Sequence, residues 1–222
     1  MKLLFLGSPG VGKGTYAQVM REELGIPQIS TGDLLREEVK KDTPAGKEIN
    51  AVMTKGDLVS DEIMLKLIES RIQEKDCENG FILDGFPRTL VQAHGLKNLI
   101  DITHVLNFKA DDEVIIQRLS GRITCKNCNT IYHKVGNQPK KENECDHCSG
   151  ELIQRKDDHP VAVQNRLDIY KEKTAPLIDH YNNEGLLVEI VINKNITEIK
   201  EKLIEKLKAF LEGKIDSVGE IK

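Results

Sequence analysis

The first pattern able to do chemistry is a glycine-rich stretch close to the start of the chain. It runs from Gly7 to Thr15 as Gly-Ser-Pro-Gly-Val-Gly-Lys-Gly-Thr, after an apolar run over residues 3–6 and before apolar residues at helical spacing. Strand, glycine-rich turn and helix form the context in which backbone N–H groups and a helix dipole surround a phosphate. Lys13 adds a mobile positive charge. We interpret the stretch as a phosphate-binding loop, with a glycine-rich turn that holds an incidental lysine as the alternative.

A candidate magnesium ligand follows from an irregularity in this loop. Gly14 stands where Ser or Thr normally follows the lysine, and Thr15 comes one residue later. Asp84 ends an apolar run over residues 81–83 and precedes Gly-Phe-Pro-Arg. An acid at the end of a strand parallel to the one that feeds the loop can hold Mg²⁺, directly or through water. Alone, these residues would read as an Asp-Gly-Pro turn, but the phosphate loop and the adjacent arginine favour the metal role.

Four of the five cysteines form two closely spaced pairs. Cys125 and Cys128 make one Cys-x-x-Cys knuckle, Cys145 and Cys148 make the other, and sixteen residues separate the two. This spacing is typical of a zinc site in which four thiolates complete a closed tetrahedron, so its expected role is structural. Two disulfides are the alternative, and spacing does not decide between zinc and iron. The fifth cysteine, Cys77, is expected to be a packed or surface thiol.

Arginines recur at the ends of the segments that carry these motifs. A guanidinium group binds phosphate through two oriented hydrogen bonds, and phosphoryl transfer is catalysed mainly by positioning and by stabilisation of charge. Taken singly, each arginine would be a solvated surface residue, but as a group they are candidate phosphate ligands. They are Arg36, Arg88, Arg118, Arg122, Arg155 and Arg166.

Composition limits the remaining possibilities. The chain has 222 residues, 39% hydrophobic and 31% charged, with a net charge of −4. This acidic balance argues against a dedicated nucleic-acid binder. No apolar run approaches the length needed to span a membrane, and the first residues enter a strand at once, which leaves no room for a cleavable signal. Together with the clustered cysteines, these features predict a cytoplasmic protein.

The apolar patterns predict an α/β fold. Buried parallel strands are expected at residues 2–6, 27–29, 81–83, 105–108 and 186–192. Helices are expected from Ser60, over 111–119, over 161–181 with a kink at Pro176, and from Asn195 to 210. Strands that alternate with helices favour a doubly wound parallel sheet with ligands at the strand carboxyl ends. Residues 30–59 and 121–158 interrupt the pattern as insertions, and the polar tail from Gly213 is expected to be loosely ordered.

Taken together, these stretches resemble the adenylate kinase family over nearly the whole chain, to about Phe210. The Gly-Lys-Gly-Thr form of the phosphate loop is itself the form found in nucleoside monophosphate kinases. Few of the matching stretches are specific alone, but their order and spacing are. They are Gly7–Thr15, Ser30-Thr31-Gly32-Asp33, Asp84-Gly85-Phe86-Pro87-Arg88-Thr89, Gln92, Arg118 with Gly121-Arg122, and Arg155-Lys156-Asp157-Asp158.

The resemblance implies a P-loop three-layer α/β fold with a central parallel sheet and two attached domains. Residues 1–29, 60–120 and 159–222 would form the core, residues 30–59 a helical AMP-binding domain, and residues 121–158 a zinc-bearing lid. The implied reaction is Mg·ATP + AMP ⇌ 2 ADP by direct in-line transfer, in a monomer that binds neither nucleic acid nor membrane. Lid closure would exclude water and so prevent hydrolysis of ATP.

The resemblance also implies roles for individual residues. The catalytic groups would be Lys13, Asp84, Arg88, Arg122, Arg155 and Arg166. ATP would be bound by Gly10, Val11, Gly12, Lys13, Gly14, Thr15, Arg118, Arg122, Ile131, Tyr132 and Lys194. AMP would be bound by Thr31, Arg36, Leu58, Val59, Gly85, Arg88, Gln92, Arg155 and Arg166. Asp84 would anchor the hydration shell of Mg²⁺, and Cys125, Cys128, Cys145 and Cys148 would hold the zinc.

Two other functions remain open from the sequence. One is phosphorylation of a different nucleoside monophosphate, against which the long lid and the Thr31/Gln92 pair speak. The other is a non-catalytic zinc-ribbon module that binds nucleic acid and uses ATP as a switch. Residues 121–156 contain seven Lys or Arg against four acidic residues, but only Tyr132 offers a stacking platform for bases, and a basic lid is also what covering ATP requires.

Overall fold

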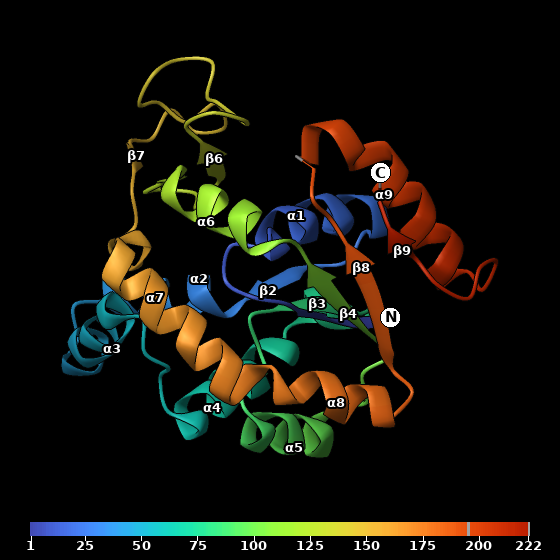
Figure 1. Cartoon of the computed structure of the whole chain (residues 1–222). Helices are drawn as coiled ribbons and strands as arrows, with labels where there is room; N and C mark the ends of the chain where they lie inside the picture. The colour runs from blue at the N-terminus through green and yellow to red at the C-terminus, as the bar shows by residue number, and fades with distance from the viewer. Residues whose placement is uncertain (195, 222) are drawn as a thin grey trace.

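The computed structural model describes residues 1–194 and 196–221, without the side chains of residues 196 and 197, and is built around one six-stranded sheet (Figure 1). Every neighbouring pair of strands in it is parallel. The order is β2-β3-β1-β4-β8-β9. Their bounds are β1 Lys2–Leu6, β2 Gln28–Ser30, β3 Phe81–Asp84, β4 His104–Lys109, β8 Leu187–Val191 and β9 Gly219–Glu220. The central parallel sheet and all five strands predicted from the sequence are thus confirmed, and β9 is an additional strand.

Helices cover both faces of the sheet (Figure 1). One face packs against α1 (Lys13–Leu24) and α9 (Ile196–Leu211). The other packs against α4 (Asp61–Ile72), α5 (Leu90–Leu99) and α8 (Pro176–Asn183). The remaining helices are α2 Thr31–Lys40, α3 Pro44–Lys55, α6 Asp112–Ser120 and α7 Pro160–Ile169, with single 3₁₀ turns at Lys75–Cys77 and Lys156–Asp158.

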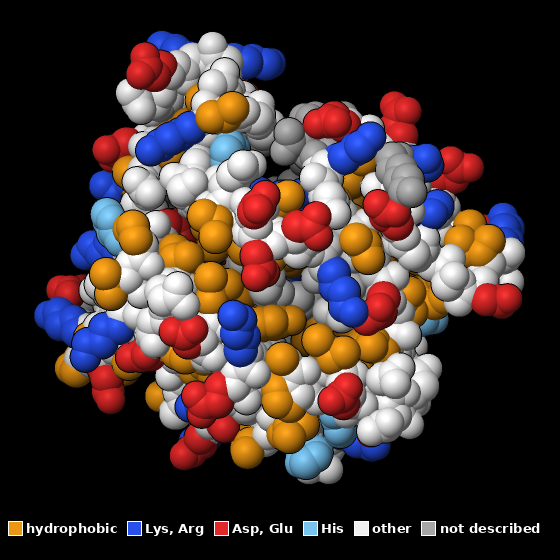
Figure 2. Space-filling view, viewed as in Figure 1, with side chains coloured by type: hydrophobic (Ala, Val, Ile, Leu, Met, Phe, Trp, Pro, Cys, Tyr) orange, Lys and Arg blue, Asp and Glu red, His pale blue; other side chains and the backbone are white. Residues whose placement is uncertain are grey.

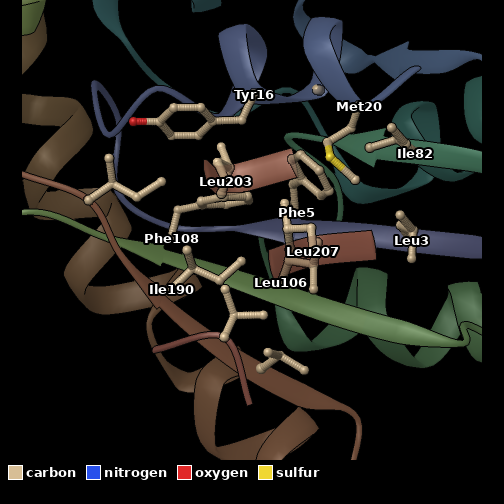
Figure 3. Close-up of a cluster of buried hydrophobic side chains, with 14 of the residues drawn as sticks. Leu3, Phe5, Tyr16, Met20, Ile82, Leu106, Phe108, Ile190, Leu203 and Leu207 are labelled. Atoms are coloured by element: carbon tan, nitrogen blue, oxygen red, sulfur yellow. The ribbon is translucent and has the colours of Figure 1, made fainter. Parts of the chain in front are cut away.

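The core is divided between the two faces because side chains alternate along a strand. On β1, Leu3 and Phe5 face α1 and α9, whereas Leu4 and Leu6 face the opposite cluster. Figure 3 shows the first cluster, in which the Phe108 ring lies 4.9 Å from that of Phe5 and 5.0 Å from that of Tyr16. A strand buried on both faces reads as a continuous apolar run, which is why β1 was visible in the sequence.

Hydroxyl side chains determine where several helices begin. The Ser60 oxygen accepts a hydrogen bond from the third residue of α4, as the sequence predicted. Ser30, Thr43 and Thr89 cap α2, α3 and α5 in the same way. Ser30 is also the last residue of β2, so the chain passes from strand to helix without a loop. This direct connection places the start of α2 at the carboxyl edge of the sheet.

Residues 121–158 form a small antiparallel sheet at the upper left of Figure 1. Its order is β6-β5-β7, with β5 at Arg122–Cys125, β6 at Ile131–His133 and β7 at Leu152–Ile153. No α-helix occurs between β5 and the turn at 156–158, all of which the structure describes. The segment therefore departs from the βα pattern of the main sheet.

The helix expected over residues 161–181 is divided. The Ala175 N–H donates to the Tyr170 carbonyl, five residues back, so the chain makes one wide turn between α7 and α8. Pro176 then occupies the first position of α8, where its missing N–H costs nothing. The chain thus changes direction just before the proline. Asn195, the expected start of the last helix, lies outside the described residues.

The expectation of a loosely ordered tail was wrong. Strand β9 adds to the free edge of β8, and Val218 and Ile221 are each only 2% exposed. The Lys206 amine donates to the carbonyls of Val218 and Glu220 at 3.0 and 3.1 Å. Three apolar residues in a polar segment, Ile215, Val218 and Ile221, were too weak a signal. Two of them are nevertheless buried, because a strand edge lies beside them.

Candidate active site

A cavity of about 290 Å³ lies at the carboxyl ends of the parallel strands. Its walls come from the loop after β1, the starts of α1 and α2, the loop after β3, and the small sheet of residues 121–158. Every residue for which the sequence predicted a nucleotide-site role lines this cavity, with two exceptions. Val11 is fully buried beneath the loop, and Lys194 is exposed on the segment after β8.

The glycine-rich loop is held in a conformation that few side chains would permit. Gly12 precedes α1 with φ at 107°, and a Cβ on Gly7 would lie 2.4 Å from the Phe108 carbonyl oxygen. The Lys13 ammonium crosses the loop and donates to the carbonyls of Gly7 and Ser8 at 2.6 and 2.9 Å. Backbone N–H groups at the start of α1 therefore face the cavity beside a lysine, an arrangement that suits anions.

Positive charge is concentrated in this cavity at an electrostatic cost. Burial lowers the pKa of Lys13 to about 7, and repulsion from Arg88, Arg166 and Arg122 adds to this shift against the attraction of Asp84. Burial likewise lowers the pKa of Arg88 to about 10. Because desolvation and like charges disfavour the protonated forms, a bound polyanion would relieve both effects.

Asp84 is the acid closest to the loop. Burial raises the pKa of its carboxyl, although Lys13, Gln28 and Arg88 oppose the shift. Its Oδ2 accepts a hydrogen bond from the Gln28 amide at 3.0 Å and would lie 3.4 Å from a Cβ placed on Gly14. The carboxylate thus faces the phosphate loop, and a hard divalent cation beside it would match this oxygen donor.

Residues assigned to AMP lie together at the end of β3. The Thr31 hydroxyl donates to the Gly85 carbonyl at 2.9 Å, and the Arg88 Nε donates to the same oxygen at 2.7 Å. Gln92, 2% exposed, receives the Arg88 backbone N–H on its Oε1 at 2.7 Å. Leu58 and Val59 add an apolar wall. Polar groups and an apolar wall in one pocket are what a nucleobase and its phosphate require.

Arg36 forms a short ion pair at the cavity wall. Its guanidinium lies 2.5 Å from the Asp33 carboxylate, one turn earlier on α2. The side chain is 24% exposed, so the pair remains in contact with solvent. Arg36 can therefore exchange this partner for a ligand phosphate at modest cost.

Two aspartates hold arginines where residues 121–158 join α7. The Arg122 Nε donates to Asp158 at 2.8 Å, and a second, shorter bond makes the pair bidentate. Arg166 contacts Asp157 at 2.7 Å and Asp158 at 3.3 Å. Burial pushes the pKa of Asp157 upward, but Arg166, Arg122 and Arg155 outweigh this effect and the net shift is downward. Asp157 therefore remains ionised, and both aspartates hold the arginines at the cavity.

Arg155 differs from these arginines. Burial lowers its pKa to about 9, and Arg36 and Arg122 reinforce the shift. Its Nε is a buried donor without a hydrogen-bond partner among the described residues. A buried unpaired donor costs free energy, and an anion in the cavity would provide the missing acceptor.

Arg118 makes contacts that sequence did not predict. Its guanidinium donates to the carbonyls of Val11 and Lys194, both at 2.7 Å. These bonds connect the phosphate loop to the segment after β8, 76 residues beyond Arg118 in the chain. The arginine therefore fixes the shape of the cavity wall, and its backbone contacts place Lys194 within reach of that wall.

Sequence reasoning did not identify Gln28 or Asp61. Gln28 holds Asp84, and Asp61 accepts from the Gln92 amide at 2.8 Å. The available signals were weak. A polar residue two positions before Ser30 shares its strand face, and an acid after a helix cap is common in any protein.

The four clustered cysteines form a metal-sized site. Their sulfurs all lie within 4.8 Å of one another, with Cys125–Cys148 and Cys128–Cys145 separations of 3.5 Å. Thiolates around one ion with bonds of about 2.3 Å would be about 3.8 Å apart, whereas a disulfide needs about 2.05 Å. The separations fit four ligands of one metal ion and are too long for disulfide bonds.

Comparison with known proteins agrees with this geometry. The family model described as adenylate kinase matches residues 5–186. An adenylate kinase from Methanosarcina barkeri is 47% identical, with 95% of this chain and 100% of the relative covered. One from Archaeoglobus fulgidus is 46% identical, covering 94% and 100% respectively. A third, from Caldicellulosiruptor saccharolyticus, is 46% identical, with 93% of this chain and 99% of the relative covered. The cavity, the loop and these matches over nearly the full length lead to one conclusion: the chain belongs to the adenylate kinase family.

Proposed function

We propose that this protein catalyses reversible transfer of the terminal phosphoryl group from Mg·ATP to AMP, giving two ADP. The observation that carries the proposal is that one cavity is lined both by the phosphate loop and by the Thr31, Arg88 and Gln92 pocket. Two nucleotides bound in these halves would direct their phosphates toward each other, with Lys13 and the arginines between them. Polyanion binding would also satisfy the unpaired Arg155 donor.

The ATP half of the site would begin at the phosphate loop. Its backbone N–H groups would hold the phosphates, and Arg122 would neutralise charge on the transferring group. The small sheet would cover the nucleotide with Ile131 and Tyr132, and the Lys194 backbone would approach the adenine. The complete set is Gly10, Val11, Gly12, Lys13, Gly14, Thr15, Arg118, Arg122, Ile131, Tyr132 and Lys194.

The AMP half would use the pocket at the end of β3. Arg88 would hold the phosphate, Leu58 and Val59 would contact the base, and Gln92 would read its hydrogen-bonding edge. The complete set is Thr31, Arg36, Leu58, Val59, Gly85, Arg88, Gln92, Arg155 and Arg166. Thr31 and Gly85 would form the floor, as their 2.9 Å hydrogen bond suggests.

Asp84 would hold Mg²⁺ through coordinated water, with the Thr15 hydroxyl beside it. The ion would bridge and neutralise the phosphates of ATP. Because Gln28 occupies one carboxylate oxygen, the other remains available to a water in the hydration shell. A buried carboxylate next to the phosphate loop supports this role.

Transfer would proceed by direct in-line attack of an AMP phosphate oxygen, without a covalent enzyme intermediate. Lys13, Arg88, Arg122, Arg155 and Arg166 would stabilise charge on the transferring group. Residues 121–158 would act as a lid and residues 30–59 as an AMP-binding domain, both closing on a core of residues 1–29, 60–120 and 159–222. Closure would exclude the water that otherwise hydrolyses ATP.

The proposal extends to the metal and to the cellular setting. One structural zinc ion would be held by Cys125, Cys128, Cys145 and Cys148. Free thiols suit a reducing compartment, so we assign the protein to the cytoplasm as a monomer. None of the helices in the described ranges has the length and apolar character needed to cross a membrane. Charges of both signs are interspersed on the face in Figure 2, rather than forming the basic stripe that nucleic acid requires.

A coupled assay that follows ADP formation tests the function. We expect ADP to accumulate only when ATP, Mg²⁺ and AMP are all present, and we expect UMP and CMP to be poor acceptors. ADP production that is faster with UMP or CMP would instead establish a different nucleoside monophosphate kinase. An absence of AMP-dependent ADP production would overturn the kinase proposal as a whole.

A further inference from the structure

The amide of Gln92 is held on both of its atoms. Its Oε1 accepts the Arg88 backbone N–H at 2.7 Å, and its Nε2 donates to the Asp61 carboxylate at 2.8 Å. The Arg88 N–H can only donate and a carboxylate can only accept. The amide therefore has one orientation, because a flip would place donor against donor and acceptor against acceptor.

Each atom of this amide retains one further hydrogen-bonding position. An amide oxygen has two acceptor positions and an amide nitrogen has two hydrogens. One of each is used internally, which leaves an adjacent acceptor and donor on the side chain that lines the cavity. This pair complements the adenine edge, where N1 accepts and the 6-amino group donates. Against hypoxanthine, the same pair would place acceptor against acceptor at O6 and donor against donor at N1–H.

We propose that Asp61 is a positioning residue for base selection, which fixes the Gln92 amide in the orientation that accepts adenine and rejects 6-oxopurines. The inference rests on the proposed function and adds a specificity determinant behind the base-reading residue. Asp61 itself is not among the residues that line the cavity within the described ranges. It therefore acts through Gln92 rather than on the nucleotide.

Contacts with the starts of α4 and α5 hold the Asp61 carboxylate in place. It is the first residue of α4, and Thr89, the cap of α5, donates to the same Asp61 oxygen at 3.0 Å. The Thr89 oxygen in turn accepts the Gln92 backbone N–H at 3.1 Å. The carboxylate thus lies between two helix N-termini, whose dipoles favour negative charge.

A purely structural role is the competing explanation. Thr89 and Gln92 have the spacing of a helix capping box, in which a glutamine three residues after the cap bonds back to the chain. In that case Asp61 would support the helix start and have no effect on base choice. The two explanations differ in selectivity between AMP and IMP, which carry the same phosphate and sugar.

The test compares kcat/KM for AMP and IMP as acceptors, with Mg·ATP held constant. We expect Asp61→Ala to lower the AMP-over-IMP ratio by about tenfold or more. The loss should appear mainly as a higher KM for AMP, with the KM for ATP unchanged. Asp61→Asn retains an oxygen that accepts from Thr89 and Gln92, so its ratio should stay within about twofold of the parent ratio.

Two comparisons separate positioning from helix stability. Glu62→Ala removes the neighbouring first-turn carboxylate, which pairs with Lys66 at 2.7 Å, and should leave the ratio unchanged. In a Gln92→Ala background, Asp61→Ala should cause no further loss of selectivity, because it acts through that amide. Where Asp61→Ala does not fold, Asp61→Ser has a side chain that is too short to reach Nε2 and should give the same fall.

An unchanged AMP-over-IMP ratio in folded Asp61→Ala or Asp61→Ser would overturn the inference. So would a fall of equal size in the Gln92→Ala background or in Glu62→Ala. None of these results affects the proposed function, which depends on whether the parent protein makes ADP from ATP and AMP.

Discussion

Lys13 lies in the wall of the cavity, in an environment that disfavours its positive charge. Its ammonium is buried beside three arginines, and its pKa falls from 10.5 to about 7. At pH 7 and below, this buried charge lowers the free energy of unfolding. Because the unfolded chain binds the proton more tightly, this destabilisation disappears as pH rises from about 7 to 10.5.

Replacing this residue should therefore separate activity from stability. We expect Lys13→Met to lower kcat by about 10²–10³-fold, since it removes charge stabilisation in the transition state. The melting temperature of the nucleotide-free variant at neutral pH should be equal or higher, because a buried cation is removed. Steady-state kinetics and calorimetry measure the two effects. A clearly lower melting temperature would show that the bonds to Gly7 and Ser8 are the main contribution of Lys13.

Nucleotide binding should change the protonation of Lys13. The pKa of Lys13 is about 7 in the free protein, so the amine is mostly charged below pH 7 and mostly neutral near pH 8. Phosphates favour the ammonium and raise its pKa, so binding should take up about one proton at about pH 8. Titration calorimetry of a two-nucleotide mimic in buffers of different ionisation enthalpy gives this number. Uptake that persists in Lys13→Met would assign the proton to another group.

Among the elements, we expect the small sheet of residues 121–158 to depend most on a metal ion. Its own buried cluster contains Tyr132 and Leu152 and is completed by two of the cysteines. So small a core cannot stabilise a sheet alone. We expect purified protein to contain one zinc ion per chain, and Cys145→Ser to lose it and melt at a lower temperature.

Turnover at low temperature should fall far less in this cysteine variant than in Lys13→Met, because the four clustered cysteines do not line the cavity in the described residues. Cys77→Ser, which alters the cysteine outside the cluster, is the matched control for zinc content. Elemental analysis without bound metal, in protein purified without chelators, would contradict the prediction.

The C-terminal strand is the other element with a measurable contribution. Truncation after Lys214 would remove β9 and expose the edge of β8, while the end of α9 remains capped by Gly213 and Lys214. Val218 and Ile221 would no longer be buried, and part of this loss is offset by chain entropy. We expect a stability loss of roughly 1–3 kcal/mol with unchanged kcat. Chemical denaturation measures it, and unchanged stability would show that the tail does not bind in solution.

At the scale of the whole molecule, the cavity joins segments that are far apart in the chain. Lys13, Arg88 and Arg166 repel one another there, and Arg36 and Arg122 repel Arg155. Burial lowers the pKa of Lys13, Arg88, Arg155 and Arg166. A ligand that spans both halves should stabilise the fold more than either nucleotide alone. At a thousand times its Kd, the expected gain is about 4 kcal/mol.

Thermal melting with ATP, with AMP and with a two-nucleotide mimic tests this expectation. The mimic should give the largest shift at equal free ligand concentration, because its Kd should be the lowest, and Arg88→Ala should reduce its advantage over ATP. A mimic that stabilises no more than ATP would mean that the two halves bind separately.

The sequence by itself determined the features that local patterns encode. Apolar runs gave the strands because those strands are buried on both faces, and glycine spacing gave the phosphate loop because only glycine tolerates its backbone. Two Cys-x-x-Cys pairs indicated a metal site, because each pair places two sulfurs on one tight turn. Only the tertiary structure decided which distant residues meet. Examples are the hydrogen bond from Arg118 to the Val11 carbonyl, 107 residues away, and the hydrogen bond from Gln92 to Asp61, 31 residues away. It also decided that the tail is ordered, because Val218 and Ile221 can be buried only beside the open edge of β8. Contacts of this kind depend on the three-dimensional arrangement of distant segments, which no local pattern specifies.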